Sequence, residues 1–406
     1  MHILLIHQAF AALDEAGGTR HIEMAQQLAR QGHRVTIIAS PVSYLTGSAG
    51  SRPAWLTREE PLPGVTILRT YTLPSIHRSF VYRVFSFLSF MFSSFWVGLG
   101  VRGVDLIWGT SPPIFQGWTA WFLSRLKRVP FLFEIRDLWP AFAIAVGVLK
   151  NKTLIRLSEW LERFLYSHAD RVIVNSPGFI QHVTSRGARQ VDLIANGADP
   201  AMFTPEARGT TFRSEFNLGD KFVVLYAGAH GLSNDLGIVL QAANHLRQRS
   251  DIVFAFVGDG KEKANLQQQA IDMDLPNVIF APPASKNQMA EVLAAADACI
   301  AILKPIAMYR TTYPNKVFDY MAAGRPVILA IDGVIRQVVE EAQAGIFVPP
   351  GDSFALASAV GNLADNRQLA QSMGVSGRQA IETHYLRSLW TERFMDIILA
   401  MHQARH

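Results

Sequence analysis

Short apolar strands alternate with helices along this chain, and the alternation starts twice. In the first half, His2–His7 predicts a buried strand, Arg20–Gln31 an amphipathic helix and Arg34–Ala39 a second strand. Two strands joined by a helix in this way pair in parallel through a right-handed crossover. The second half begins again with the strand Phe222–Tyr226, so each half predicts its own α/β sheet.

Further strands complete both predicted sheets. In the first half they are Thr66–Arg69, Asp105–Trp108, Phe131–Ile135, Arg171–Asn175 and Val191–Ile194. In the second half they are Ile252–Val257, Val278–Phe280, Ala298–Leu303, Pro326–Ala330 and Gly345–Val348. We therefore expect two Rossmann-like domains. Because open parallel sheets bind ligands at the carboxyl ends of their strands, the crevice between the halves is the expected ligand site.

The length of 406 residues also favours two domains, because one hydrophobic core usually stops growing below that size. The polar stretch Pro205–Asp220 looks irregular and predicts the linker. We expect one domain at residues 1–204 and a second at residues 205–383. Residues 384–406 contain a predicted long helix, from His384 to Gln403, that crosses back to the first domain.

Composition and charge narrow the compartment and the partners. The net charge of +5 suits anionic substrates or an anionic membrane surface, and no basic cluster interleaved with aromatic residues indicates nucleic acid. The single cysteine, Cys299, excludes internal disulfides and a cysteine-rich zinc site, which fits a reducing cytoplasm. Met1–Phe10 lacks the basic start of a signal peptide, and Asp14 and Glu15 interrupt its apolar run.

Residues 84–101 form an uncharged, aromatic-rich stretch between Arg83 and Arg102. The stretch has the minimum length for a membrane-spanning helix, but four serines and two glycines dilute it. Three interpretations stay open: helices of the first domain that also touch the bilayer, ordinary core helices, or a true span. We favour the first, because a segment lying in the interface lets a soluble protein meet a lipid-linked partner.

Cofactor and metal motifs are missing from the sequence. Neither the Gly228 loop nor the Gly258 loop completes Gly-x-Gly-x-x-Gly after a strand, and no Walker sequence occurs. The twelve histidines show no convincing metal-ligand spacing. We therefore expect no cofactor and no metal.

The loop Gly17-Gly18-Thr19 precedes the first predicted helix. Two glycines in this position let main-chain N–H groups approach an anion, and the helix dipole favours its charge. The loop is therefore predicted to face a phosphate. The alternative interpretation is a tight turn between strand and helix.

Three charged residues, Glu134, Arg136 and Asp137, lie where the predicted strand Phe131–Ile135 ends. Charged groups are costly there unless they are solvated, paired or functional. We favour the interpretation that they face the reacting ligand. The alternative is that Arg136 pairs with Glu134 or Asp137 and holds the loop.

The segment Tyr313–Val327 is the most informative part of the chain. A helix is predicted to begin near Asn315 and to end at Gly324. Lys316 then lies in the first turn, where the helix dipole and the ammonium together favour a diphosphate. Asp319, one turn later, can accept hydrogen bonds from a ribose diol. A capped surface helix is the alternative, but it does not explain a lysine at a helix start.

This segment resembles the donor-binding signature of glycosyltransferase family 4, the retaining enzymes of GT-B fold. That signature is Glu-x7-Glu followed by Ala-x-Gly-x-Pro-Val; Asp319 matches the second acid, which binds the nucleotide ribose, and Thr311 stands at the first. Pro314-Asn315-Lys316 and Arg136–Pro140 resemble a bacterial branch that builds surface polysaccharides. The resemblance covers essentially the whole chain. It implies a GT-B fold, two Rossmann-like domains facing across a cleft, with the acceptor on the first and the nucleotide-sugar on the second.

The resemblance also implies the donor site. In many members an Arg and a Lys after the first strand of the second domain grip the diphosphate, but Gly228–Asp235 contains neither. The diphosphate is therefore assigned to Lys316, helped by the main chain of the loop. The other implied donor-binding residues are Gly231, Leu232, Ser233, Asn315, Lys263, Ala281 and Pro282, with Lys304 as a weaker candidate. Lys263 and Lys304 are equally well interpreted as surface lysines.

The implied reaction moves a hexosyl or N-acetylhexosaminyl group, with retention, from a nucleotide-sugar to a lipid-linked or polysaccharide-precursor acceptor. UDP is favoured over GDP. Lys316 is expected to stabilise the leaving diphosphate, Arg136 to position a phosphate and Asp137 to orient the sugar or the acceptor. The expected location is the cytoplasm, peripheral on the inner face of the cell membrane. The alternatives are another GT-B enzyme, such as a nucleotide-sugar epimerase or a soluble small-molecule transferase, and a non-catalytic scaffold of polysaccharide assembly.

Overall fold

The computed structural model describes residues 1–15, 17–42, 55–74 and 80–404. Contacts divide the chain into two compact units. The first unit contains Met1–Ala12, Gly18–Ala195 and the residues from Ser388 onward. The second contains Leu13–Gly17 and Asn196–Arg387.

The stretch predicted as a linker, Pro205–Asp220, lies inside the second unit. It contains the helix α7 (Thr210–Glu215) and is not irregular throughout. Phe212 and Leu218 are buried in the hydrophobic core of that unit. The unit boundary therefore falls earlier, between Ala195 and Asn196. The sequence did not indicate this, because the two apolar residues stand among polar ones and form no apolar run.

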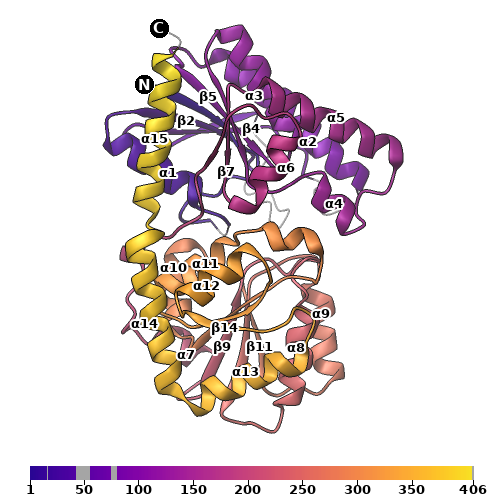
Figure 1. Ribbon diagram of the computed structural model, residues 1–406, viewed down its shortest axis with the longest axis vertical. Coiled ribbons are helices and arrows are strands. Elements are labelled where there is room, and N and C mark those ends of the chain that lie inside the picture. The colour runs from indigo at the N-terminus through magenta and orange to yellow at the C-terminus, as the bar shows by residue number, and fades with distance from the viewer. Residues whose placement is uncertain (16, 43–54, 75–79, 405–406) are drawn as a thin grey trace. The chain divides into compact units, whose positions relative to one another are not determined.

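The first unit is built on an eight-stranded sheet in the order β3-β4-β2-β1-β5-β6-β7-β8. Figure 1 labels several of its strands and helices. Its strands are β1 (His2–Ile6), β2 (Arg34–Ala39), β3 (Leu56–Leu62), β4 (Val65–Thr70), β5 (Leu106–Ser111), β6 (Phe131–Ile135), β7 (Arg171–Val174) and β8 (Val191–Leu193). All pairs are parallel except the edge pair β3–β4. The sequence did not predict β3, because its residues before Leu62 are exposed and form no apolar run.

Helices cover this sheet, and every residue of β1, β5 and β6 is buried, as expected for parallel strands with both faces covered. The helices of the first unit are α1 (Arg20–Arg30), α2 (Phe80–Gly100), α3 (Phe115–Lys127), α4 (Ala141–Ala145), α5 (Lys152–His168), α6 (Ile180–Ser185) and α15 (Arg387–Gln403).

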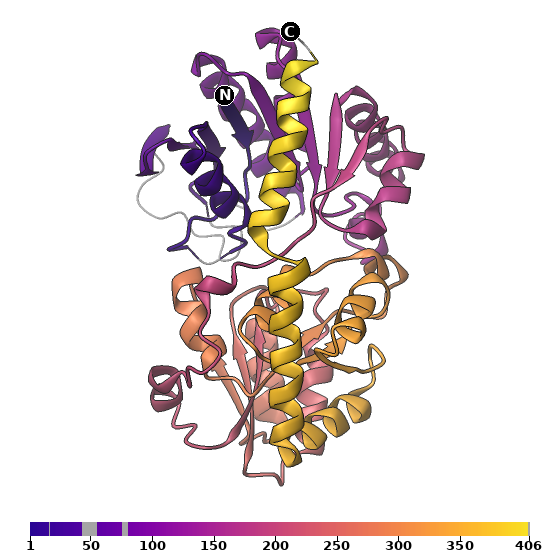
Figure 2. The same ribbon diagram turned by 60° about the vertical axis from the view of Figure 1, so that its left-hand side comes forward.

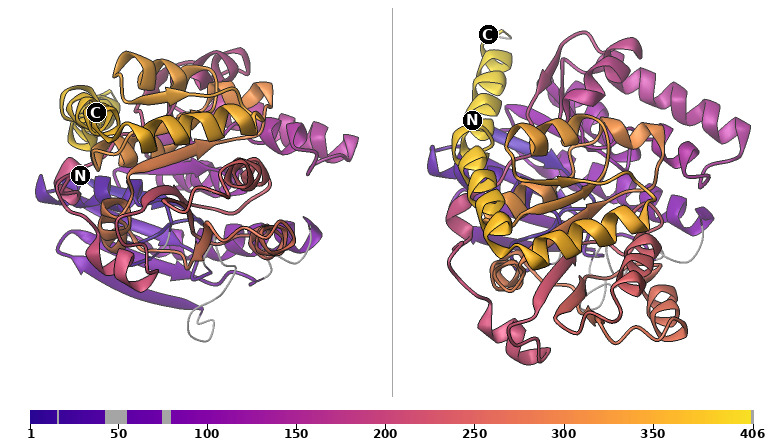
Figure 3. Two further views of the ribbon diagram at one scale, coloured as in Figure 1. Left: turned by 90° about the horizontal axis from the view of Figure 1, so that it is seen from below. Right: turned by 60° about the horizontal axis from the view of Figure 1, so that its bottom comes forward.

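The second unit has a six-stranded, fully parallel sheet in the order β11-β10-β9-β12-β13-β14. Its strands are β9 (Phe222–Ala227), β10 (Ile252–Val257), β11 (Val278–Ala281), β12 (Ala298–Ile302), β13 (Val327–Ala330) and β14 (Gly345–Phe347). Besides α7, its helices are α8 (Leu236–His245), α9 (Lys263–Asp272), α10 (Lys286–Ala294), α11 (Asn315–Ala322), α12 (Val334–Glu341), α13 (Ser353–Asp365) and α14 (Arg367–His384). Helices lie on both faces of this sheet, so it has a hydrophobic cluster on each side (Figure 3).

Strand order reverses once in each sheet. The reversal lies between β1 and β5 in the first unit and between β9 and β12 in the second. Ligands of open α/β sheets bind at the carboxyl ends of the strands where the order reverses. A ligand-binding site is therefore expected at the loops after β1 and β9.

The long C-terminal helix predicted from His384 to Gln403 is α15, which begins three residues later, at Arg387; the helix α14 precedes it, and Tyr385 and Leu386 separate the two (Figure 2). The main chain there pairs with Ala198: the Ala198 N–H donates to the Tyr385 carbonyl at 3.1 Å, and the Arg387 N–H donates to the Ala198 carbonyl at 2.9 Å. This bridge replaces helical hydrogen bonds and ends α14. In α15, the Phe394 ring lies 4.5 Å from that of Trp108 and attaches the helix to the first unit.

Candidate active site

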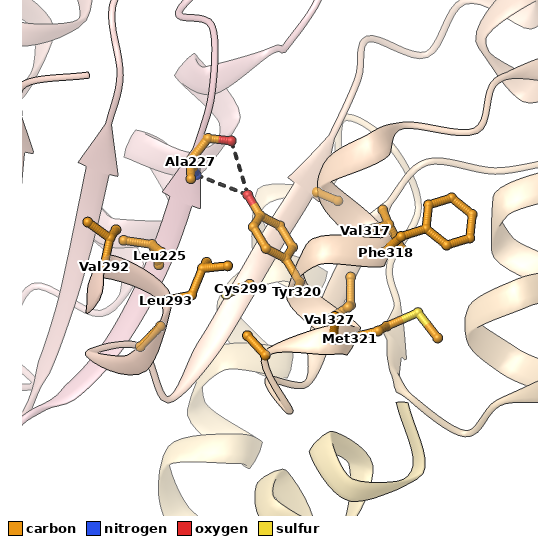
Figure 4. Packing of buried hydrophobic residues seen from close by; sticks show 14 of the residues in the cluster. Leu225, Ala227, Val292, Leu293, Cys299, Val317, Phe318, Tyr320, Met321 and Val327 are labelled. Atoms are coloured by element: carbon orange, nitrogen blue, oxygen red, sulfur yellow. Dashed lines mark hydrogen bonds between the residues drawn. The ribbon is translucent and has the colours of Figure 1, made fainter. Parts of the chain in front are cut away.

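Helix α11 carries the predicted donor residues and is fixed at the carboxyl end of β9. The buried Tyr320 hydroxyl accepts a hydrogen bond from the Ala227 N–H at 3.0 Å and donates one to the Ala227 carbonyl at 3.1 Å (Figure 4). Val317 and Met321 of the same helix are fully buried in the hydrophobic cluster around Tyr320. Gly324, with a φ of 68°, follows the helix where the sequence predicted its end.

Lys316 lies in the first turn of α11, as predicted. Its Nζ is 3.9 Å from the centre of the Tyr226 ring, and a Cβ added to Gly228 would lie 2.9 Å from Nζ. Within the described ranges no carboxylate pairs with this ammonium. Burial lowers the pKa of Lys316 to about 7. The ammonium is thus held against an aromatic ring beside a glycine, where an anion can reach it.

Asp319, one turn further on, is held by a residue that sequence reasoning missed. Its Oδ1 accepts a hydrogen bond from the Lys286 Nζ at 2.7 Å, and its Oδ2 lies 3.4 Å from the Asn315 Nδ2. Lys286 begins α10 and is buried beside the carboxylate. No local pattern in the sequence connects these two positions, which only the packing of α10 against α11 brings together.

Lys263 does not stand free for a diphosphate, contrary to its prediction as a donor residue. Its Nζ donates to the carbonyls of Gly258 at 2.8 Å and Ala281 at 3.1 Å, and so ties the end of β10 to the end of β11. Ala281 is buried and Pro282 is exposed, so the strand end predicted to contact the base has one accessible residue.

The loops after β9 and β12 are joined at the point where strand order reverses. The Lys304 N–H donates to the Ser233 carbonyl at 2.9 Å, and the Tyr309 hydroxyl lies 2.5 Å from the Ser233 hydroxyl. Gly231 is half-buried and Leu232 is exposed in the same loop. The predicted diphosphate loop after β9 is therefore held by residues that follow the neighbouring strand β12.

His230, which sequence reasoning also missed, lies fully buried in the loop after β9. Its ring centre is 6.0 Å from that of Tyr226 and 6.3 Å from those of Phe256 and Phe280. Neither ring nitrogen has a hydrogen-bond partner among the residues that the structure describes. The position of His230 in the sequence could have indicated a role, because many members of the resembled family carry basic residues in this loop.

In the first unit, the prediction that Glu134 faces the reacting ligand is wrong. Its side chain is fully buried: Oε1 lies 3.1 Å from the Arg20 Nε, and Oε2 lies 2.7 Å from the His21 Nε2 and 3.0 Å from the Trp108 Nε1. These neighbours lower the pKa of Glu134 to about 2, although burial opposes them. Burial lowers the pKa of His21 to about 4, so the ion pair is between Glu134 and Arg20. Glu134 is a structural charge.

Arg136 and Asp137 follow β6 as predicted, and Arg136 lies near a second buried histidine. The Arg136 guanidinium donates to the Pro112 carbonyl at 3.0 Å. Burial raises the pKa of Asp137 to about 7 against the opposing charge of Arg136, and its Oδ1 lacks a hydrogen-bond partner within the described residues. His7, at the end of β1, is fully buried, and burial followed by Arg136 holds its pKa well below the usual range. A neutral imidazole and a readily protonated carboxyl suit the hydroxyl groups of a sugar.

The predicted phosphate loop precedes α1 as expected. Gly17 and Gly18 are exposed, and Thr19 is buried. The Thr19 hydroxyl donates to the Glu23 carboxylate at 2.5 Å, so its side chain braces the first turn of α1. The phosphate role of this loop stays a prediction.

Comparison with known proteins extends this description. The sequence profile of the family described as glycosyl transferase 4-like domain matches residues 17–197, and that described as glycosyl transferases group 1 matches residues 221–366. Over 321 residues the chain is 26% identical to the putative colanic acid biosynthesis glycosyl transferase WcaI of Escherichia coli strain K12, covering 76% of this chain and 78% of the relative. Over 270 residues it is 25% identical to a GDP-mannose-dependent alpha-mannosyltransferase of Mycobacterium tuberculosis, covering 66% and 67%.

Solved structures share the fold. The sucrose-phosphate synthase of Thermosynechococcus elongatus matches with a TM-score of 0.79 and 21% identity over 99% of both chains. The Anabaena protein HepE, in complex with UDP and glucose, matches with a TM-score of 0.72 and 16% identity over 98% of this chain and 100% of HepE. The chain thus has the GT-B fold, built from two Rossmann-like units. It belongs to glycosyltransferase family 4 and is a glycosyltransferase, as its donor segment suggested.

Proposed function

We propose that this glycosyltransferase moves a hexosyl or N-acetylhexosaminyl group, with retention, from a UDP-sugar to a lipid-linked glycan or polysaccharide precursor. The observation that carries the proposal is the ammonium of Lys316, which no carboxylate within the described ranges neutralises. A diphosphate leaving group needs such a charge. HepE, a protein of the same fold, has been solved with UDP and with UDP-glucose, which supports a uridine nucleotide.

The proposed reaction breaks the bond between the anomeric carbon and the phosphate oxygen. The acceptor hydroxyl forms its bond on the same face of the sugar, and its proton passes to the leaving phosphate. Lys316 offsets the charge that grows on the diphosphate, and Asp319 accepts hydrogen bonds from the ribose. Arg136 and Asp137 position a phosphate and the sugar or acceptor.

The donor assignment is tested by measuring melting temperature and turnover with a panel of nucleotides. We expect UDP and UDP-sugars to raise the melting temperature, by an amount equivalent to about 2.7 kcal/mol at a hundred times Kd. UDP release should depend on an added lipid-linked acceptor. A response to GDP alone would contradict the uridine assignment. Donor consumption without acceptor would point to an epimerase, and no response to any nucleotide would point to a scaffold.

The lipid-linked acceptor is supported by an apolar surface on the first unit. In α2, Ser86, Ser93 and Ser94 are buried against the unit, so the serines that dilute the segment face inward. Several aromatic residues of the helix face outward: Phe92 is 62% exposed and Trp96 is 54% exposed. By length and composition alone, Tyr82–Gly100 can cross a membrane, but its serine face packs within the unit. We place this helix along the membrane surface.

The surface continues over two neighbouring helices, because α3 packs against both α2 and α5 (Figure 1). We call it the three-helix apolar face. It consists of Tyr82, Phe85, Leu88, Phe92, Trp96, Phe122, Leu126, Leu154, Leu157 and Trp160, all exposed. The exposed Lys150, Lys152 and Arg156 border it at the start of α5. Apolar side chains with basic neighbours suit an anionic lipid surface, and the proposed location is the inner face of the cell membrane.

Membrane binding is tested with a triple variant, Phe85→Ser, Phe92→Ser and Trp96→Ser. Burying each aromatic side chain is worth about 1.5–3 kcal/mol, so the triple variant should bind anionic vesicles at least about a hundredfold more weakly. Co-sedimentation with phosphatidylglycerol vesicles measures this. Phe87 of the same helix is 9% exposed and packs on Phe115, so it is left unchanged.

The matched control replaces three exposed apolar residues of the second unit, Ile271, Phe354 and Val375, by serine. It should sediment with vesicles as the wild type does. Equal sedimentation of both triple variants would contradict the membrane assignment.

A further inference from the structure

His230 is held in place by its main chain, not by its side chain. Its N–H donates to the Asp259 carbonyl at 2.8 Å, and its carbonyl accepts from the Glu262 N–H at 2.9 Å. Gly258 and Gly260 make this approach possible. Their φ angles are 147° and 151°, and a Cβ on Gly258 would lie 1.9 Å from the Gly228 carbonyl oxygen. The loops after β9 and β10 are thus locked together around the imidazole.

The imidazole itself is a buried polar group without a partner. Both ring nitrogens lack a hydrogen bond in the part of the chain that the structure describes. Leaving such a group unsatisfied in the folded protein is costly, so the unpaired ring calls for an explanation. Packing does not supply one, because a phenylalanine or leucine fills the space between Tyr226, Phe256 and Phe280 without that cost.

Charged groups face His230 from several elements. Lys263 approaches from α9, Lys316 from α11 and Asp259 from the loop after β10, while the neutral Tyr226 faces it from β9. Burial, followed by the two lysines, lowers the pKa of His230 to about 4. Free of ligand, the ring is therefore neutral and lies beside two ammonium groups.

We propose that His230 takes up a proton when the diphosphate of the donor binds, and so supplies a third positive charge beside Lys316 and Lys263. The inference rests on the proposed nucleotide-sugar donor. Burial and, after it, the two lysines keep the imidazole neutral, and a diphosphate at the first turn of α11 brings negative charge next to these lysines. It reverses the sign of the local field, and its oxygens accept the hydrogen bonds that the ring now lacks.

This role replaces the arginine that many family members carry in the same loop. An arginine there is charged at all times and repels Lys316 and Lys263 in the empty site. A histidine becomes charged only when the anion is present. The protein therefore avoids three adjacent cations in its free state and obtains them in the bound state.

The test is calorimetric titration with UDP-glucose at pH 5.5 in two buffers of different ionisation enthalpy. At this pH Lys316 is already protonated and His230 is still neutral, so uptake reports the histidine. UDP-glucose is used because its diphosphate is a diester, without the ionisation near pH 6 of a terminal phosphate. We expect an uptake of roughly half a proton or more per ligand, since a pKa raised to 5.5 already gives half.

His230→Gln should bind UDP-glucose more weakly at pH 5.5, by about twofold for a bound-state pKa of about 5.5 and about tenfold for one of about 6.5, and with almost no uptake. The control His245→Gln replaces an exposed histidine of α8 and should behave as the wild type. In the wild type, one histidine NMR signal should titrate below pH 5 without ligand and above pH 5.5 with it, a result that does not depend on the variant folding.

UDP-glucose binding without proton uptake, or with uptake unchanged in His230→Gln, would overturn this inference and leave the proposed function standing. No binding of any nucleotide would overturn both.

Discussion

Replacing Lys316 by methionine is expected to lower kcat about 10²–10³-fold, the usual effect of removing one charge-stabilising donor from a transition state. The melting temperature should hardly change. Burial disfavours the charged form of Lys316, as its pKa of about 7 indicates, and methionine keeps the contact with the Tyr226 ring. A steady-state assay at saturating donor, combined with a melting curve, separates lost turnover from lost folding.

The same lysine predicts a pH dependence. Because burial lowers its pKa to about 7, the charged fraction falls as the pH rises through 7. Donor binding by the wild type should therefore weaken between pH 6 and pH 8, and this dependence should be much smaller in the Lys316→Met variant. The matched control is Lys261→Met, which removes an exposed lysine close to the site and should leave both kcat and the pH profile unchanged. Near-normal turnover in Lys316→Met would contradict the proposed role of Lys316 in binding the diphosphate.

Replacing Glu134 by glutamine is expected to destabilise the first unit by about 3–5 kcal/mol, the usual cost of removing one partner from a buried ion pair. Arg20 then keeps a buried charge whose partners include the carbonyls of Ala195 at 2.8 Å and Ile194 at 2.7 Å but no longer the carboxylate. Thermal and urea denaturation measure the loss. Turnover well below the melting temperature should be retained, because this carboxylate does not face the ligand.

The sign of the acid dependence follows from the lowered pKa of Glu134. The folded value is about 2, below the usual value of about 4.3 for the unfolded chain. The stabilisation by Glu134 is therefore complete above pH 4.3 and is lost as the pH falls toward 2. The variant should lose this part of its acid sensitivity. Glu60→Gln, in an exposed pair with Arg58, is the control and should cost less than about 1 kcal/mol. An equal effect of the two substitutions would contradict the structural role of Glu134.

The strands were predictable where both faces of a sheet are covered. The strand Phe131–Ile135 was found at its predicted bounds, because a strand buried on both faces is a continuous apolar run. The edge strand Leu56–Leu62 was missed because its exposed residues carry no such signal. The start of the last helix was predicted three residues early for another reason: the main chain before α15 pairs with Ala198, a distant residue.

The donor helix was predictable because its signals are local. A helix start near Asn315, a lysine in the first turn and a glycine stop at Gly324 lie within a few residues of one another. The partners in the site are not local. Lys286 stands 33 positions from Asp319, and Arg20 stands 114 positions from Glu134. Crossovers between strands bring such residues together, and no spacing along the chain predicts these contacts.

The sequence by itself therefore determined two α/β units, membership of a glycosyltransferase family and a lysine at the start of the donor helix. Each follows from apolar periodicity or from a short run of residues. Only the tertiary structure decided that Glu134 is a buried structural charge, that Lys286 holds Asp319 and that the His230 ring, unpaired among the described residues, feels the charges of Lys263 and Lys316. Pairing and protonation depend on burial and on neighbouring charges, and both are set when distant strand ends assemble at one edge of a sheet.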